Sequence, residues 1–247
     1  MNFLRALMIS IAISPLAVAA DWSTDVALVK DMVVLDKAYI PALMAVRKGD
    51  AARAEEAVEQ LDESWGTFQS TWGSEVSSEW RSGFEGIDLL VSESKEFVAA
   101  RDFERAYATL DEIRHAFAEL REKEGISYFL DFVTSTETAL DEVVRTVSRD
   151  LGTPLSPKEL DVVETGLLLA QKRWKVVTDT RIDKIVYRID IYYMGDLAST
   201  RSDGTLLLKE LTRDARKMER ATLAEKIAEL TGRVEHFLEI LGATPGS

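Results

Sequence analysis

Two stretches of the chain with one shared pattern decide the fold: DAARAEEAVEQLDESWGTF at residues 50–68 and DFERAYATLDEIRHAFAEL at residues 102–120. A shift of 52 residues superimposes them and matches identical residues at three positions, Asp50 with Asp102, Arg53 with Arg105 and Ala54 with Ala106. The apolar positions match as well, Val58 with Leu110, Leu61 with Ile113, Trp65 with Phe117 and Phe68 with Leu120. Since apolar residues three, four or seven apart share one helix face, each copy predicts an amphipathic helix.

Each copy follows another segment with helical periodicity, residues 26–49 before the first and residues 80–98 before the second. Asp50 is a residue type that favours the N-cap of a helix, and Pro41 predicts a kink in the first segment. A repeated helical hairpin buries its apolar stripes best as a four-helix bundle. We therefore expect residues 22–125 to form an antiparallel four-helix bundle.

Residues 126–243 predict a second helical bundle of three or four helices. A fifth helix is expected from Phe129 to Val147, and Ser156-Pro157 is a typical start for a sixth that continues to Gly195. A loop at 199–204 and a last helical stretch to Leu241, with a break near Arg216, complete the chain. The fold class is thus all-α, with tandem antiparallel bundles, and the short junction at Gly125 predicts nearly continuous fourth and fifth helices.

The first twenty residues have the pattern of a secretory signal peptide. Residues 3–19, FLRALMISIAISPLAVA, carry one charge, Arg5, and end in the small residues that precede a cleavage site. A short uncleaved anchor is the alternative. From Asp21 onward no apolar run reaches the ~20 residues of a spanning helix. We expect residues 1–20 to be removed and the mature chain to be periplasmic, without a stable membrane span.

Charge and cysteine content exclude several function classes. The chain has 43 acidic and 30 basic residues, a net charge of −13, and no cysteine. Nucleic acids and anionic lipids require a basic face, so neither is an expected partner. Without cysteine there is no disulfide framework, no thiolate metal site and no covalent c-type haem attachment.

Few side chains are available for catalysis. The two histidines, His115 and His236, lie far apart, and no G-x-S-x-G, H-E-x-x-H, P-loop or G-x-G-x-x-G motif occurs. The sequence therefore predicts a non-enzymatic binding or interaction protein without a cofactor, whose partner is a protein or small ligand of the periplasm.

A divalent metal ion is the alternative that the histidines suggest. Glu112 and His115 have the Glu-x-x-His spacing of di-iron bundles, but no second such pair exists. His115 with Asp111 and Glu119, one turn to each side, could hold a metal ion on the surface, and His236 with Glu235 and Glu239 has the same pattern. A solvated helix face is the competing interpretation, because His115 falls opposite the apolar stripe of its helix.

Aromatic residues give two further hypotheses. Trp65 and Trp174 occupy core positions, whereas Trp72 and Trp80 flank a polar loop and either rim a ligand cleft or pack structurally. Residues 182–196 mix tyrosines with charged residues and predict an interaction surface or a bundle end. A homodimer formed through this segment is one form that the interaction could take.

The first half resembles the small periplasmic b-type cytochromes and the cytochromes c-prime. The resemblance covers residues 28–122 and rests on DMVVL at 31–35, WRSGF at 80–84, ARDFERA at 100–106, and Leu110 through Arg114 with Phe117. It implies a four-helix bundle with haem between the helices near one end, and it makes Met32 the match for the axial methionine. The axial histidine falls on Ala118, which cannot bind iron. A protein that binds haem b through Met32 is therefore the alternative function that the resemblance implies.

Overall fold

The computed structural model describes residues 26–73, 78–123 and 125–243, which form helices and turns without a strand. The prediction of an all-α fold is thus confirmed for this part of the chain. The predicted signal peptide lies outside the described residues. None of the described helices combines the length and the apolar composition required to cross a membrane.

The first half contains four long helices, α1 (Val26–Arg47), α2 (Ala51–Trp72), α3 (Ser78–Ala99) and α4 (Phe103–Lys123). The second half contains four more, α5 (Phe129–Ser148), α6 (Pro157–Asp179), α7 (Met194–Asp214) and α8 (Arg220–Gly242). Two short 3-10 helices, η1 (Ile191–Tyr193) and η2 (Ala215–Lys217), precede α7 and α8. The sequence allowed three or four helices in the second half, and the described chain has four there.

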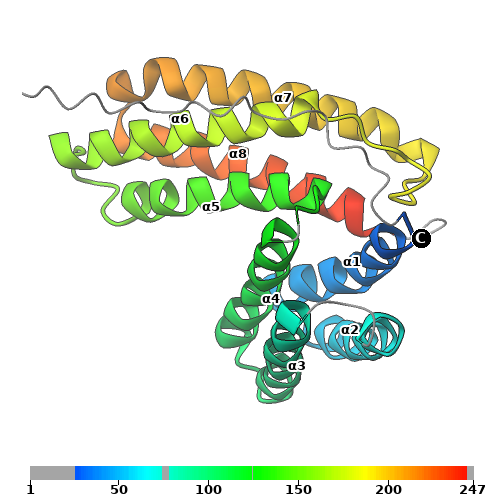
Figure 1. Ribbon diagram of the computed structural model, residues 1–247. Helices are drawn as coiled ribbons and strands as arrows, with labels where there is room; N and C mark the ends of the chain where they lie inside the picture. Colours follow the sequence, from blue (N-terminus) through cyan, green and yellow to red (C-terminus); the bar gives the residue numbers. More distant parts are fainter. Residues whose placement is uncertain (1–25, 74–77, 124, 244–247) are drawn as a thin grey trace, which may run out of the picture.

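The helices form two groups that meet along α1 and α8. Within the first group α1 contacts α2 and α4, and α3 lies between α2 and α4; α5 to α8 contact one another in the same cyclic order. Figure 1 shows the two groups crosswise, with α1 of the lower group reaching the end of α8 in the upper one. The α1–α8 contact is the most extensive one between the groups.

The repeat extends to the backbone at the start of each copy. Asp50 and Asp102 each accept a hydrogen bond from the backbone N–H three residues later, at 3.3 Å and 3.2 Å. The residues before these caps, Gly49 and Arg101, both have positive φ, at 66° and 57°. Each position ends the preceding helix in the left-handed conformation that glycine adopts without strain.

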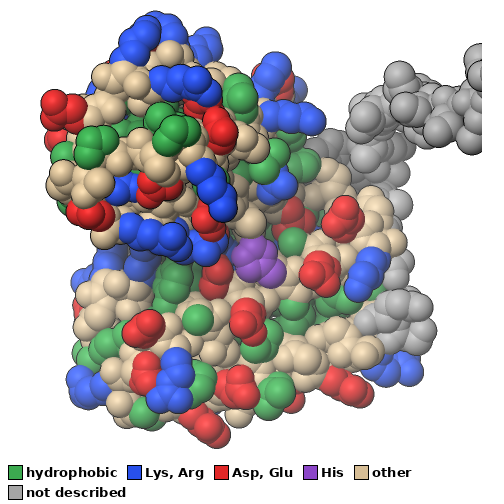
Figure 2. All heavy atoms as spheres, turned by 90° about the vertical axis from the view of Figure 1, so that its left-hand side faces the viewer, with side chains coloured by type: hydrophobic (Ala, Val, Ile, Leu, Met, Phe, Trp, Pro, Cys, Tyr) green, Lys and Arg blue, Asp and Glu red, His purple; other side chains and the backbone are tan. Residues whose placement is uncertain are grey.

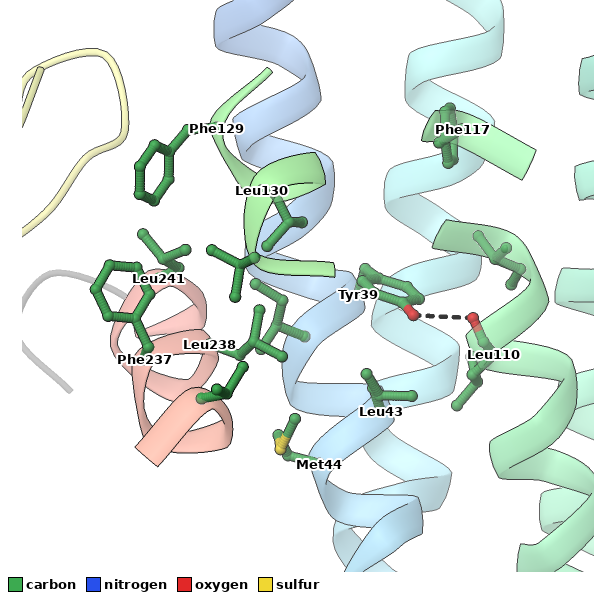
Figure 3. Close-up of a cluster of buried hydrophobic side chains, with 14 of the residues drawn as sticks. Tyr39, Leu43, Met44, Leu110, Phe117, Phe129, Leu130, Phe237, Leu238 and Leu241 are labelled. Atoms are coloured by element: carbon green, nitrogen blue, oxygen red, sulfur yellow. Dashed lines mark hydrogen bonds between the residues drawn. The ribbon is translucent and has the colours of Figure 1, made fainter. Parts of the chain in front are cut away.

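Buried side chains form one continuous core through both groups. Trp65 packs edge-on against Phe84 and Phe117 in the first group, at 5.1 Å and 5.6 Å between ring centroids. Trp174 packs against Phe237 in the second, at 5.9 Å. Both tryptophans are 1% exposed, so their predicted core placement is confirmed. Figure 3 shows side chains of α8, including Leu238 and Leu241, on one side of α1 and Leu110 of α4 on the other.

Two predicted element boundaries are wrong. The expected helix up to Gly195 ends at Asp179, because the Asp183 side chain accepts hydrogen bonds from the N–H groups of Ile185 and Val186 and fixes a turn there. The expected loop at 199–204 lies inside α7. There Gly204 lets the helix approach Trp174, since a Cβ at this position would lie 2.8 Å from its ring. The predicted break near Arg216 is confirmed and corresponds to η2.

The predicted continuity of the fourth and fifth helices is also wrong. α4 ends at Lys123 and α5 begins at Phe129, with Gly125 at a φ of 69° between them. Figure 1 shows the two helices meeting at an elbow. The chain can bend here because glycine adopts positive φ without a steric penalty.

Candidate functional site

The seam between the two helix groups begins with a close contact of α1 and α8. A Cβ built at Gly242 would lie 2.6 Å from Cγ2 of Ile40, so only glycine permits this approach without a shift. Lys48 pairs with Glu239 at 2.6 Å and Arg47 pairs with Glu235 at the far end of α1. These contacts hold the end of α8 against α1. Figure 2 shows charged side chains of both signs, and a histidine, along the hollow between the two groups.

On the inner side of α1, Asp36 belongs to a cluster of ionisable groups. Its carboxylate accepts a hydrogen bond from the hydroxyl of Tyr128, just before α5. The Arg121 guanidinium packs over the Tyr128 ring, 4.5 Å from its centroid. Its Nε, at 2.8 Å, and its Nη2 both donate to the Asp131 carboxylate. Burial raises the pKa of Asp36 to about 7, although the charge of Arg121 and the Tyr128 hydrogen bond act in the opposite direction. The site can therefore bind or release a proton near neutral pH.

A second buried pair joins α4 to α5. Arg114 forms an ion pair with Glu137 across the two helices, and both side chains are 7% exposed. Arg114 also contacts Asp111 on its own helix. Nearby, the Tyr39 hydroxyl donates to the backbone carbonyl of Leu110 at 2.9 Å, as Figure 3 shows. Removal of either partner would leave an uncompensated buried charge, so the two side chains depend on each other.

On the outer side of α1, Lys37 lies at the point where three segments meet. Its Nζ donates to the backbone carbonyl of Ala243, after α8, at 2.6 Å. Burial lowers the pKa of Lys37 to about 8; Asp36 opposes this effect, whereas Arg188 on the α6–α7 connection adds to it by charge repulsion. Within the described part of the chain, neither Lys37 nor Arg188 forms an ion pair. The hydrogen-bond partner of the Lys37 ammonium is thus a neutral backbone carbonyl.

A groove of about 470 Å³ opens beside Lys37, between α1, α2 and the end of α8. Its volume lies within the roughly 300–1,000 Å³ that is typical of small-molecule sites. Apolar side chains contribute to its lining, namely Ile40, Pro41, Met44, Ala45 and Ala57. The charged residues of the lining are Lys37, Lys48, Asp50, Arg53, Glu56 and Glu239.

Most charges of the groove compensate one another. Lys48 pairs with Glu239, and Arg53 lies 3.5 Å from Asp50. The remaining cation of the lining is Lys37, whose hydrogen-bond acceptor is a neutral carbonyl. The groove therefore combines apolar side chains with three cations and three carboxylates, and Lys37 lies at its α8 end.

The α6–α7 connection contains most of the segment predicted as an interaction surface, residues 182–196. Tyr187 anchors it to the junction, because its hydroxyl accepts a hydrogen bond from the Phe129 backbone N–H at 3.0 Å. Ile185, Ile191 and Tyr192 point outward and are 77%, 62% and 86% exposed. The segment thus has two buried residues, Tyr187 and Ile189, with exposed apolar neighbours. Dimer formation stays a prediction.

The residues predicted for metal binding do not gather into a metal site. In the described ranges no three His, Asp or Glu side chains are placed to hold an ion. His115 is half-exposed and lies 3.6 Å from Asp111, while Glu112 is exposed and Glu119 lies 4.0 Å from Lys123. The Asp111 carboxylate, which accepts from the imidazole, raises the pKa of His115, and this favours protonation over metal binding.

His236 is likewise engaged in the α1–α8 contact. It lies 3.5 Å from Glu239, which also binds Lys48, and its neighbour Glu235 pairs with Arg47. Both carboxylates that the sequence offered as ligands therefore neutralise cations of α1.

Met32, the predicted haem ligand, is 1% exposed in the core of the first group. It lines a cavity of about 20 Å³, together with Trp65 and Phe117. Such a space holds about one water molecule, far less than an organic cofactor requires. Since Ala118 offers no donor where the resemblance places the histidine, the residues present do not fit a haem group.

Trp72 and Trp80, proposed as the rim of a cleft, are both buried, at 8% and 2% exposed. Trp72 Nε1 donates to Asp31 on α1 at 3.1 Å, and Trp80 packs edge-on against Phe84 at 5.6 Å. Of the two interpretations that the sequence allowed, structural packing is the one that these contacts support.

The residues that carry the junction were not identified from the sequence. Asp36 and Lys37 interrupt an otherwise apolar stretch between Leu35 and Tyr39, and such charges in a buried helix are a signal of a polar partner. The partner of Asp36, Tyr128, lies in a connection with no regular pattern, so periodicity did not reveal it.

No protein-family model, no curated protein and no solved structure matches the chain. The resemblance to the four-helix-bundle cytochromes therefore stays a prediction, and the function is inferred from the site itself.

Proposed function

We propose that this is a non-enzymatic binding protein whose ligand occupies the groove between α1, α2 and α8. The observation that carries the proposal is the ligand-sized groove of about 470 Å³, with apolar side chains in its lining and a cation at one end. Concave sites of this size are the usual form of small-molecule sites.

The proposal includes export to the periplasm. Its support is the sequence of residues 1–20, with an apolar segment followed by small residues. Expression of the full chain with its leader in a Gram-negative host tests it. A mature protein that begins at Asp21 and leaves the cell with the periplasmic fraction is expected; an intact leader in the cytoplasm would refute export.

Binding is tested by ¹H–¹⁵N NMR on the folded chain with a panel of small apolar molecules and their polar derivatives. Shifts confined to the amides of Ala45, Ala57 and Glu239 are expected for ligands that enter the groove. The variant Ala57→Phe fills the groove and should abolish them, whereas Ala228→Phe, at an exposed position of α8, should not. Each ligand should be recovered chemically unchanged, and its conversion would contradict a non-enzymatic role.

A further inference from the structure

We propose that one buried water molecule binds in the small cavity that Met32, Trp65 and Phe117 line, and that it bridges the Arg114 guanidinium to the Asp36 carboxylate. The site lies in the core, apart from the groove between α1, α2 and α8. It goes beyond the proposed function and does not depend on a ligand in that groove.

The size of the cavity fits one water molecule. Its volume of about 20 Å³ exceeds the roughly 10–15 Å³ that a water molecule requires. Helices α1 to α5 all contribute to its lining, and Figure 3 shows three of these residues, Tyr39 of α1, Phe117 of α4 and Leu130 of α5. Cavities with an apolar lining stay empty, so the polar groups of the lining decide whether this one holds water.

Arg114 supplies an unpaired donor to this lining. Its side chain is 7% exposed, its Nη1 binds Glu137, and its Nη2 contacts Asp111. Its Nε is buried and has no hydrogen-bond acceptor in the described structure. A buried donor without an acceptor costs free energy, and a water molecule in the adjoining cavity removes that cost.

Asp36 supplies the acceptor. It lines the same cavity, and its Oδ2 accepts the hydrogen bond from Tyr128. Within the described part of the chain, its Oδ1 accepts none. A water molecule that accepts from Arg114 can therefore donate to Asp36, because a carboxylate oxygen has lone pairs to spare. Such a water has the two polar partners that hold it in place.

The local charge favours a neutral ligand over an anion. The two cations of the lining, Arg114 and Arg121, already pair with three carboxylates outside it, and Asp36 adds a fourth carboxyl group; the three are Asp111, Glu137 and Asp131. A chloride ion would add negative charge to this excess. Water adds none, and it both donates and accepts.

The bound water joins two contacts of the junction between the helix groups. Arg114 connects α4 to α5 through Glu137, and Asp36 connects α1 to the start of α5 through Tyr128. A water molecule between Arg114 and Asp36 makes these two contacts one hydrogen-bonded network. Bonds within such a network strengthen one another in the low dielectric of a core.

Nuclear Overhauser effects between water and buried methyl groups test the proposal. Ile87 and Ile113 line the cavity and are 0% and 2% exposed, so bulk water does not reach them. We expect cross-peaks from the water resonance to both residues, and none to Ile227, which is equally buried in the second group. Tyr39→Phe removes the hydroxyl of the lining, and the cross-peaks should persist in this variant because they come from water.

Two substitutions of Val91, which also lines the cavity, test the site further. Val91→Ile enlarges the side chain and should expel the water, so the cross-peaks at Ile87 and Ile113 should disappear. Val91→Thr keeps the shape and adds a hydroxyl that can bind the water. It should lower the urea midpoint by no more than about half the shift of Val98→Thr, which buries a hydroxyl away from the cavity. Val98 is the matched control, because it is equally buried on α3 and is not part of the lining.

Three outcomes would overturn the proposal. The first is the absence of water cross-peaks at Ile87 and Ile113 in the folded wild type, which would mean a dry cavity. The second is an equal shift of the urea midpoint in Val91→Thr and Val98→Thr. The third is an anomalous signal in the cavity of crystals soaked in bromide, which would assign the site to an anion. Circular dichroism of each variant confirms that the fold is retained.

Discussion

The hydroxyl of Tyr128 donates a hydrogen bond to the carboxylate of Asp36, and this bond spans the two helix groups. Tyr128 lies just before α5 and is 1% exposed, whereas Asp36 lies in the middle of α1. The bond sits one residue away from Lys37, which faces the groove on the other side of the helix. Neighbouring residues of α1 therefore connect the contact between the two helix groups to the lining of the groove.

Tyr128→Phe should destabilise the protein by about 1–3 kcal/mol, because Asp36 loses its donor in a largely enclosed site. Tyr192→Phe, at a residue that is 86% exposed, should change the free energy of unfolding by less than about 0.5 kcal/mol. Urea denaturation of both variants measures the difference. Equal effects of the two substitutions would show that the Tyr128 bond does not contribute.

Asp36→Asn should change how stability depends on pH. The folded-state pKa of about 7 lies above the ordinary value of 3.8, so the folded protein keeps a proton that the unfolded chain loses. Stability should therefore fall as the pH rises from about 4 to 7, by up to about 1.4 kcal/mol per unit. Asparagine cannot titrate, so this contribution disappears in the variant.

The comparison is made from chemical denaturation of wild type and Asp36→Asn at several pH values between 4 and 7. The difference between the two curves isolates Asp36 from the other groups that titrate in this range. Its charged and titratable neighbours are Arg121, Tyr128, Asp131, Lys37 and Tyr187. Parallel curves would mean that Asp36 ionises normally.

Gly242→Ala should loosen the contact between α1 and α8. The new Cβ would lie 2.6 Å from Ile40, and overpacking of this kind costs about 1–3 kcal/mol. Gly232→Ala, ten residues earlier on α8 with no atom within 4 Å, should instead stabilise the protein by about 0.5–1 kcal/mol. Thermal unfolding should show that the two variants shift the melting temperature in opposite directions. Shifts in the same direction would contradict the packing argument.

Gly49 and Arg101 occupy equivalent positions in the two copies of the repeat, and substitutions at these positions should have opposite effects on stability. Arg101 has a φ of 57°, so Arg101→Gly should relieve strain and stabilise by about 0.5–1 kcal/mol. Gly49→Ala introduces the same strain at a φ of 66° and should destabilise by about 1 kcal/mol. Arg101→Gln serves as the control for the lost charge. Guanidinium unfolding measures all three, and a neutral Gly49→Ala would refute the role of backbone conformation.

Met32→Leu should cost less than about 1.5 kcal/mol, because a side chain of similar volume replaces a core methionine. Titration of both proteins with haemin, followed by the absorbance of the Soret band, should show no Met32-dependent spectrum. A low-spin spectrum that vanishes in Met32→Leu would restore the cytochrome-like function and contradict the packed core around Trp65.

The sequence by itself determined the helices of the first half and the core that they bury. Helical periodicity and capping act within a few residues, so the stripe through Leu61 and Trp65 and the caps at Asp50 and Asp102 could be predicted from local pattern. The charge of −13 and the absence of cysteine also led directly to the predictions that nucleic acid is no partner and that no haem is attached covalently. The second half was predicted less well, because α7 passes through residues 199–204, whose composition favours a loop.

Only the tertiary structure decided the site. Lys37 and Ala243 are 206 residues apart in the chain, and their hydrogen bond exists because α8 docks on α1 at Gly242. Tyr128 reaches Asp36 from a connection that has no periodic signal. Helix formation depends on neighbours along the chain, whereas the groove depends on which helix faces meet, and that choice is made by packing across the whole molecule.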